Sequence, residues 1–304
     1  MSSTPRHVVV VVNPAKFDGD TTAVRALVIE AASAFGGAVP DFIETTRDDP
    51  GFGQARAAVN EGADLVCALG GDGTVRAVAG SLAGTGTALG LLPGGTGNLL
   101  ARNLNIPFSD LAEAVRVAWA GRDRRIDVGW VQRDDAAPEM FAVMAGAGFD
   151  AAIMGDAPAG LKDKVGWAAY VVAAARNLRG EPYHTHVTVD GADAGSFDAR
   201  TVVVGNCGTL QGGIELFPQA QVDDGVLDAV VLTPKSLAAW ASAATALVGD
   251  GSDSPHLERM TGRDIIVQLA PPQKVQLDGE VFPEAARLSL RVDRQALVVR
   301  VPNP

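Results

Sequence analysis

Two glycine-rich stretches constrain the fold of this chain more than any other feature. They are GGDGT at residues 70–74 and LPGGTGN at residues 92–98; each follows an apolar run and precedes helical spacing. A strand, a glycine turn and a helix form a βα unit, and α/β folds bind ligands where their strands end. Glycine there permits positive φ and a close backbone approach, so main-chain N–H groups can hold anionic oxygen. The pattern predicts two loops that grip one polyphosphate.

The two halves of the chain have different hydrophobic patterns. In the first half, apolar runs at 7–12, 41–45, 64–70 and 88–93 alternate with helical spacing, as at 24–35 and 53–62. This alternation predicts an α/β domain with a Rossmann-like parallel sheet covered on both faces. From about residue 124, short runs with two-residue alternation predict a mostly antiparallel domain, interrupted by helices near 163–178 and 235–248. We place the boundary near residue 127, giving domains 1–127 and 128–304.

The amino-acid composition limits the classes of partner that the protein can bind and the cellular compartments in which it can work. The net charge of −11 disfavours broad binding to nucleic acid or to an anionic membrane surface. The longest apolar stretches fall short of the roughly 20 residues of a membrane span, and no export signal is visible. Cys67 and Cys207 are far apart in sequence, which is typical of reduced, buried thiols. These features predict a cytoplasmic protein without a transmembrane segment.

The polar residues of the two stretches suggest a chemistry. Asp72 could hold Mg²⁺ directly or through water, and Thr74 and Thr96 place hydroxyl groups at helix starts. Asn98 could fix the second loop or contact a nucleotide. Tight turns and helix caps are the plain structural alternative. Neither stretch has the Gly-Lys-Ser/Thr ending of a Walker loop or the G-x-G-x-x-G pattern of dinucleotide-binding proteins.

Five motifs in order resemble the diacylglycerol kinase catalytic-domain family, which includes bacterial lipid kinases, sphingosine kinases and ceramide kinases. They are VVNP at 11–14, GGDGT, LPGGTGN, PQAQVDDGVLD at 218–228 and LDGE at 277–280. GGDG alone is shared with NAD kinases, whereas the ordered set is specific. The resemblance implies an α/β nucleotide domain that faces a C-terminal β-sandwich across a cleft, with ATP and Mg²⁺ as cofactors. It also implies that the last segment, about 290–304, packs back on the first domain.

The resemblance assigns site residues by their positions in these motifs. The nucleotide-binding set is Asn13, Thr46, Gly71, Asp72, Gly73, Thr74, Gly95, Thr96, Gly97 and Asn98. Thr45 competes with Thr46 because the following loop is long. The metal ligands are Asp224 and the adjacent Asp223. Asp278 is the catalytic base, with Glu280 supporting the metal and water network; Asp72 is the alternative base.

Several alternatives stay open. Asp278 and Gly279 are also a strong hairpin-turn signal, and the DDG at 223–225 could be a turn before a strand. Leu99 and Ala77 stand where relatives often carry acids, which leaves the magnesium network and the acceptor lipid undefined. His184 and His186 share a strand face but lack a third zinc ligand. Lysine and aromatic residues in the predicted helix near 163–178 could contact a membrane, although core packing explains them as well; they are Lys162, Lys164, Trp167 and Tyr170.

Together these features predict an ATP-dependent lipid kinase, a phosphotransferase of lipid metabolism. Its acceptor would be diacylglycerol or a related lipid such as a sphingoid base, met at the membrane surface on the cytoplasmic side. An NAD kinase and a non-catalytic nucleotide or lipid sensor are the alternatives. The sequence fits a homodimer but does not fix the oligomeric state.

Overall fold

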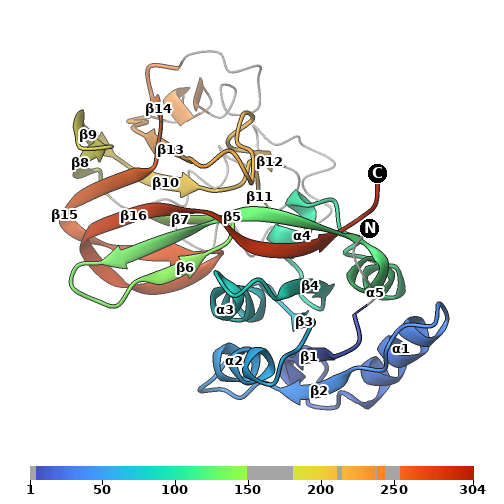
Figure 1. Ribbon diagram of the computed structural model, residues 1–304. Coiled ribbons are helices and arrows are strands. Elements are labelled where there is room, and N and C mark those ends of the chain that lie inside the picture. Colours follow the sequence, from blue (N-terminus) through green and yellow to red (C-terminus); the bar gives the residue numbers. More distant parts are fainter. Residues whose placement is uncertain (1–4, 149–180, 211–213, 237, 241, 244–253) are drawn as a thin grey trace. The chain divides into compact units, whose positions relative to one another are not determined.

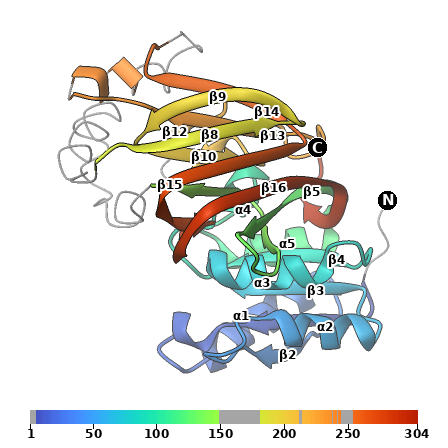
Figure 2. The same ribbon diagram turned by 90° about the vertical axis from the view of Figure 1, so that its left-hand side faces the viewer.

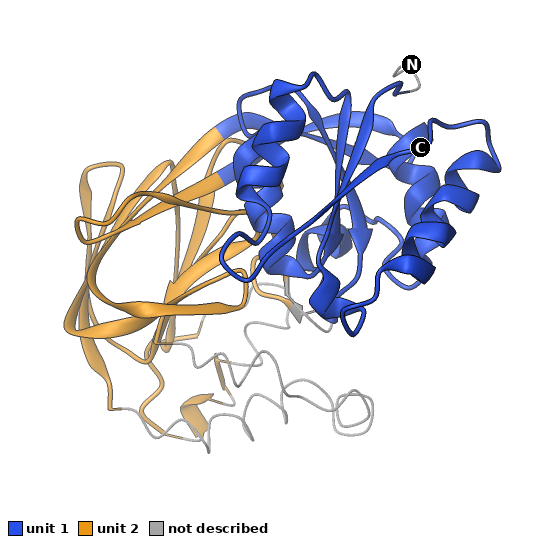
Figure 3. Cartoon of the chain, turned by 90° about the horizontal axis from the view of Figure 1, so that it is seen from below, with its two compact units in different colours: residues 1–128, 294–304 blue, residues 129–293 orange. Residues whose placement is uncertain are grey.

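The computed structural model describes residues 5–148, 181–210, 214–236, 238–240, 242–243 and 254–304. Its internal contacts divide the chain into two compact units (Figure 3). Unit 1 comprises Met1–Val128 and Arg294–Pro304, and unit 2 comprises Gly129–Asp293. The division falls one residue after the boundary expected near residue 127, and the last eleven residues belong to unit 1.

Unit 1 is built on a parallel sheet in the order β2-β1-β3-β4-β16 (Figure 1). The strands are β1 (Val8–Val12), β2 (Asp41–Glu44), β3 (Leu65–Gly70), β4 (Ala88–Pro93) and the last part of β16 (Glu280–Val301). The helices are η1 (Pro14–Lys16), α1 (Thr22–Ser33), α2 (Phe52–Asn60), α3 (Asp72–Leu82), α4 (Leu99–Asn103) and α5 (Leu111–Ala120). The predicted parallel α/β domain is thereby confirmed.

The hydrophobic pattern explains how the layers form. All five valines of β1 are buried, as expected of a strand covered on both faces. Helices α1 and α5 cover one face of the sheet, and α2 and α3 cover the other (Figure 1). The buried face of α1 carries Val24, Val28 and Ala32. Leu27, within the helical spacing at 24–35, is instead 40% exposed, because helix α1 presents a neighbouring stripe to the sheet. Phe35, also 40% exposed, lies beyond the end of α1.

The strand order determines where a ligand can bind. Val10 of β1 pairs with Phe42 of β2 on one side and with Cys67 of β3 on the other. The direction of winding therefore reverses between β1 and β3. In open α/β sheets, ligands bind at the carboxyl ends of the strands beside such a switch point. Asn13 directly follows β1 there, and Gly71 directly follows β3.

Unit 2 is mostly antiparallel, as predicted (Figure 2). Its strands are the end of β5 (Arg122–Arg133), β6 (Glu139–Phe141), β7 (Met144–Ala147), β8 (Tyr183–Val189), β9 (Ala192–Ala199), β10 (Thr201–Gly205), β11 (Thr209–Leu210), β12 (Ile214–Glu215), β13 (Leu227–Leu232), β14 (Leu257–Gly262), β15 (Asp264–Leu277) and the first part of β16. Strands β14, β13, β10, β7, β15 and β16 are neighbours in this order. Inward-facing residues of these strands form one apolar core.

Strand β15 joins two layers of this β-sandwich. Residues 265–270 pair with β8, whereas residues 275–277 pair with β7. The pairing with β16 shifts register between Gln268 and Gln273. Pro271 and Pro272 lie in that interval, and because proline has no N–H to donate, it is tolerated at such a bulge. The two alternating sequence runs at 264–270 and 274–280 therefore belong largely to one bent strand.

Other expectations differ in detail. The runs at 286–292 and 296–301 both lie in β16. Strands β9 and β14 were not predicted, because both mix exposed polar residues with few apolar ones. Helix α5 was not predicted either, although Asp110 caps its start and its sequence carries a buried apolar face: Ala114, Val115, Val117, Ala118 and Trp119. The helix expected at 163–178, with Lys162, Lys164, Trp167 and Tyr170, lies outside the described residues. Within 235–248, the described residues 238–240 and 242–243 are helical, as expected. Within the described ranges, no helix has both the length and the apolar character needed to cross a membrane.

Candidate functional site

The first glycine cluster ends β3 and begins α3. Gly71 is the N-cap of α3, and no side chain caps that end of the helix. Asn13, which follows β1, donates from Nδ2 to Thr74 Oγ1 at 3.2 Å, and its backbone N–H donates to Leu69 O at 2.9 Å. Thr74 is only 3% exposed. These bonds tie the end of β1 to β3 and to the first turn of α3.

The second glycine cluster packs directly against the first. Gly94 N donates to Gly70 O at 2.9 Å, and a Cβ on Gly95 would lie 2.8 Å from the Cα of Gly71. Any side chain at Gly95 would push the two loops apart. None of the cluster glycines, all of them described, has a positive φ. Of the two properties that glycine permits here, the structure displays close packing without a positive φ.

The Asp72 carboxylate joins the two loops. Its Oδ2 accepts a hydrogen bond from Asn98 N at 3.1 Å, and its Oδ1 accepts one from Leu99 N at 2.6 Å. A Cβ on Gly97 would overlap Oδ2 of Asp72. The first acid of α3 thus caps the start of α4. Since Leu99 takes part through its backbone, its apolar side chain does not disturb this contact.

Asn98 holds the second loop from within. It adopts a left-handed conformation with φ of 48°, which asparagine tolerates better than most residues. Its Oδ1 accepts from Gly95 N at 3.3 Å and its Nδ2 donates to Gly95 O at 2.7 Å. Of the two roles suggested for Asn98, the structure displays loop fixation. Thr96, between these partners, is exposed.

The loop after β2 contains the two competing threonines. Thr45 is 8% exposed, whereas Thr46 is exposed and its Oγ1 accepts from Asp49 N at 3.0 Å. Asp49 in turn accepts from Gly51 N at 3.1 Å and from Gly53 N at 2.9 Å. The extra length of this loop is therefore a capping structure for α2. Nucleotide contact by Thr46 stays a prediction.

One cationic residue near the clusters had not been singled out from the sequence. Lys16 ends η1, three residues after Asn13, and its side chain passes over Gly71. A Cβ built on Gly71 would lie 3.2 Å from Lys16 Cε and 3.6 Å from Nζ. The sequence gives Lys16 no motif of its own, because its direction depends on how β1 and β3 lie side by side.

In unit 2, Asp278 and Gly279 form the hairpin turn between β15 and β16. Their φ values of 47° and 88° are both positive, and Leu277 pairs with Glu280 across the turn. These are the features of a two-residue type I′ turn, so the turn interpretation is confirmed. Glu280 itself is exposed.

The Asp278 carboxylate is held by three backbone donors. It accepts from Ala142 N and Val143 N, each at 2.9 Å, and from Met144 N at 3.0 Å. The residue is 4% exposed, so these bonds compensate for the burial of its charge. They also fix the orientation of a carboxylate that the sequence motif marks as the base.

The DDG segment at 223–225 is also a turn, and several acidic side chains lie in or near it. Asp224 accepts from Gln221 N at 3.3 Å and from Val226 N at 3.2 Å. Burial raises the pKa of Asp228, and the negative charge of Asp224 raises that pKa further. The carboxylates of Asp224 and Asp228 repel each other. A divalent cation bound between them would relieve this repulsion. Among the described residues, no three His, Cys, Asp or Glu side chains gather into a metal site, so Mg²⁺ would need water or substrate oxygens.

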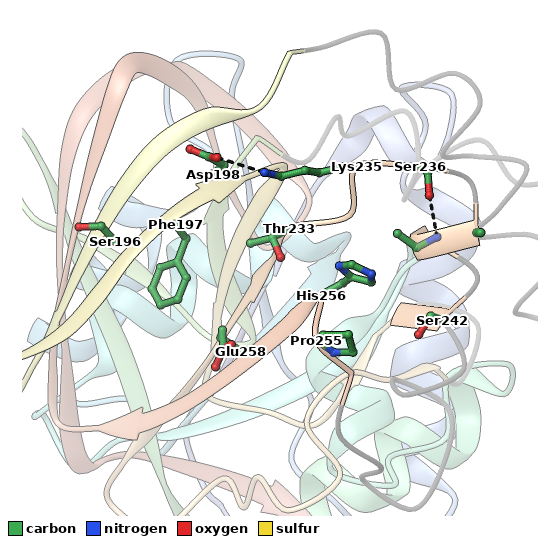
Figure 4. Close-up of a pocket in the computed structure, with 12 residues that line it drawn as sticks. Ser196, Phe197, Asp198, Thr233, Lys235, Ser236, Ser242, Pro255, His256 and Glu258 are labelled. Atoms are coloured by element: carbon green, nitrogen blue, oxygen red, sulfur yellow. Dashed lines mark hydrogen bonds and ion pairs between the residues drawn. The ribbon is translucent and has the colours of Figure 1, made fainter.

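A separate cavity of about 640 Å³ lies in unit 2 (Figure 4). Phe197, Thr233, His256 and Glu258 surround it, and the exposed Lys235–Asp198 ion pair of 3.4 Å lies at its edge. None of its lining residues is a predicted site residue. The neighbouring His186 forms a hydrogen bond between its Nδ1 and Ser196 Oγ at 3.0 Å.

Known proteins share both halves of this chain. Residues 7–131 match the family model for the diacylglycerol kinase catalytic domain. Residues 143–301 match the model for the YegS C-terminal NAD kinase beta sandwich-like domain. A Pectobacterium atrosepticum protein named "Probable lipid kinase YegS-like" is 32% identical over 268 residues, covering 83% of this chain and 84% of that protein.

Two further similar proteins show how far the similarity extends. A Mycobacterium tuberculosis protein named diacylglycerol kinase is 33% identical over 173 residues, which cover 57% of this chain and 56% of that protein. The chain thus spans about half the length of this relative. A crystal structure of a Bacillus anthracis diacylglycerol kinase aligns with a TM-score of 0.75 at 20% identity, covering 100% of this chain and 99% of that one. That structure supports the fold alone.

Proposed function

Because the chain belongs to the diacylglycerol kinase catalytic-domain family, whose named members are kinases, we propose that it is an ATP-dependent lipid kinase. It transfers the γ-phosphoryl group of ATP to the hydroxyl group of a lipid. Diacylglycerol or a related lipid such as a sphingoid base is the acceptor. The enzyme meets this lipid at the cytoplasmic surface of a membrane.

The observation that carries the proposal is the junction of the two glycine loops. The loops meet backbone to backbone at the switch point of the parallel sheet, where α3 begins without a side-chain cap. Uncapped N–H groups at a helix N-terminus carry partial positive charge and bind phosphate. The loops are held by Asp72 and Asn98, so their shape exists before a nucleotide arrives.

The proposed reaction depends on positioning and on charge. Phosphoryl transfer is accelerated mainly by holding donor and acceptor in line and by stabilising the negative charge on the phosphate oxygens. Mg²⁺ would supply part of that stabilisation, with Asp224 and Asp223 as its protein ligands and Glu280 in the surrounding water network. Asp278 accepts the proton of the attacking lipid hydroxyl, and its three backbone donors keep its carboxylate in one orientation.

The activity is tested with the purified full chain, labelled ATP and Mg²⁺. The acceptors are vesicles containing diacylglycerol, vesicles containing a sphingoid base, and NAD in solution. We expect label in a lipid and none in NAD. Label in NAD alone would make the protein an NAD kinase, and nucleotide binding without any transfer would make it a sensor.

The role of Asp278 is tested against a second turn of the same design. Asp190 and Gly191 join β8 to β9 with positive φ, and Asp190 Oδ1 accepts from Arg263 N and Asp264 N, both at 2.9 Å. Asp278→Asn and Asp190→Asn both replace a carboxylate that accepts backbone N–H bonds in an Asp-Gly turn. Only Asp278→Asn should lower kcat, by about 100-fold or more, as expected for loss of a general base.

Thermal unfolding of both variants controls for damage to the fold. If Asp278→Asn keeps near-normal turnover while Asp72→Asn loses it, the base is Asp72. If both turn variants lose activity in proportion to their loss of stability, Asp278 has only a structural role.

A further inference from the structure

We infer that Lys16 contacts the phosphate groups of the bound nucleotide. This inference rests on the proposed nucleotide-binding function and adds a residue to it. The glycine clusters contain no lysine, unlike a Walker loop. Lys16 supplies the missing cation from a different segment, the turn that follows β1.

The side chain of Lys16 crosses the first loop at Gly71. Lys16 Cε lies 3.2 Å and Nζ 3.6 Å from the point where a Cβ of Gly71 would be. The aliphatic stem therefore packs over a residue that has no side chain. This places the ammonium group beside the first turn of α3, where Gly71 is the uncapped N-cap.

The local electrostatics favour an anion at this place. The N-terminus of a helix is the positive end of its dipole, so a neighbouring ammonium group is repelled by it. Within the described part of the chain, Lys16 makes no ion pair that would offset this repulsion. The Asp72 carboxylate, in the first turn of α3, accepts hydrogen bonds from the backbone N–H groups of Asn98 and Leu99. A phosphate group would attract both the ammonium group and the helix end.

The path of the lysine side chain also gives a reason for glycine at position 71 that phosphate binding alone does not give. A methyl group there would be 3.2 Å from Lys16 Cε, closer than most real contacts, and the lysine would have to move. Gly71 thus leaves room for the lysine stem, while Gly95 is needed for contact between the loops.

Calorimetric titration of the full chain with ATP, ADP and adenosine tests the inference. Lys16→Met keeps the length of the stem and removes the charge. We expect it to weaken ATP and ADP binding roughly 10- to 100-fold, the range for a hydrogen bond to a charged group. Adenosine has no phosphate, so its affinity should be unchanged. Lys16→Arg should retain most of the affinity for ATP.

The control is Arg56→Met, which removes an exposed cation from α2 in the same unit. It should leave all three affinities unchanged. If Lys16→Met binds ATP as tightly as the wild type, or loses adenosine affinity by the same factor as ATP, the inference is wrong while nucleotide binding stands. If the wild-type chain binds neither ATP nor ADP, the proposed function itself fails.

Discussion

At the scale of single residues, carboxylate and amide side chains hold the proposed site through bonds to backbone groups. Asp72 connects the glycine loops, Asn98 closes the second loop on itself, and Asp278 collects three N–H donors. Asp72 and Asp278 were expected from their motifs to hold a metal ion or accept a proton, and Asn98 was expected to fix its loop or contact a nucleotide. The structure adds that each one also shapes the backbone, so a substitution changes geometry as well as charge.

Removal of the Asp72 carboxylate should loosen the second loop. In Asp72→Ala, the N–H groups of Asn98 and Leu99 lose their acceptors, and each such bond to a charged group contributes about 1.5–3 kcal/mol. We expect hydrogen exchange at these two amides to accelerate at least roughly tenfold. The control is Asp49→Ala, which removes the acceptor of the Gly51 and Gly53 amides. Unchanged exchange at residues 98 and 99 in Asp72→Ala would contradict the bracing role.

At the scale of elements, the strands and glycine turns of unit 1 could be predicted because each depends on the residues of a short stretch of sequence. Buried runs gave β1, β3 and β4, and the glycine clusters marked the turns into α3 and α4. What the pattern does not contain is the lateral order of strands. The contact of Lys16 with Gly71 arises because β1 and β3 are neighbours in the sheet. This neighbourhood cannot be predicted from the spacing of residues along the chain.

The Asp-Gly turns show a related limit. VDGA at 189–192 and LDGE at 277–280 have the same local signal and form the same kind of turn. In both turns the aspartate binds backbone N–H groups of another segment. Local pattern therefore predicts the turns but does not distinguish a base from a structural acid. Only the family resemblance singled out Asp278.

The Asp190 turn should contribute stability in a pH-dependent way. Backbone hydrogen bonds from Asp264 and Arg263 lower the pKa of Asp190 below 3.8. A lowered pKa in the folded state stabilises the fold above the unfolded pKa, and this stabilisation is lost as the pH falls through the folded pKa. Asp190→Asn should therefore lower Tm at pH 7, and the difference from wild type should shrink below pH 3.8.

The matched control is Asp198→Asn, whose carboxylate forms an ion pair with the exposed Lys235. Exposed ion pairs contribute little, so its Tm should stay close to wild type at pH 7. A Tm difference for Asp190→Asn that is constant from pH 7 to pH 3 would show that the carboxylate charge is not responsible.

At the scale of the whole molecule, the chain leaves unit 1 after residue 128 and returns to it at residue 294. The returning segment pairs with β4 through Val298 and Val299 and buries Leu297 and Val301. Arg300 Nη1 donates to Gly121 O at 3.0 Å, beneath the surface of the unit. Unit 1 is thus built from two segments that are distant in sequence.

Deletion of residues 294–304 should destabilise unit 1 severely. The loss of Leu297, Val299 and Val301 alone removes roughly 5–9 kcal/mol of apolar burial, comparable with the entire stability of a typical domain. We expect the truncated chain to lose cooperative unfolding and ATP binding. Deletion of 302–304 removes only the exposed bond from Asn303 Nδ2 to Ala120 O and should be tolerated. Unchanged cooperative unfolding without 294–304 would show that the returning strand is dispensable.

The return of the chain to unit 1 has a consequence for biosynthesis. Domains made early on the ribosome often fold before the rest of the chain appears. Here unit 1 lacks its part of strand β16 until residues 294–304 have been translated and have left the ribosome. Unit 1 can therefore be completed only after the whole of unit 2 has been synthesised.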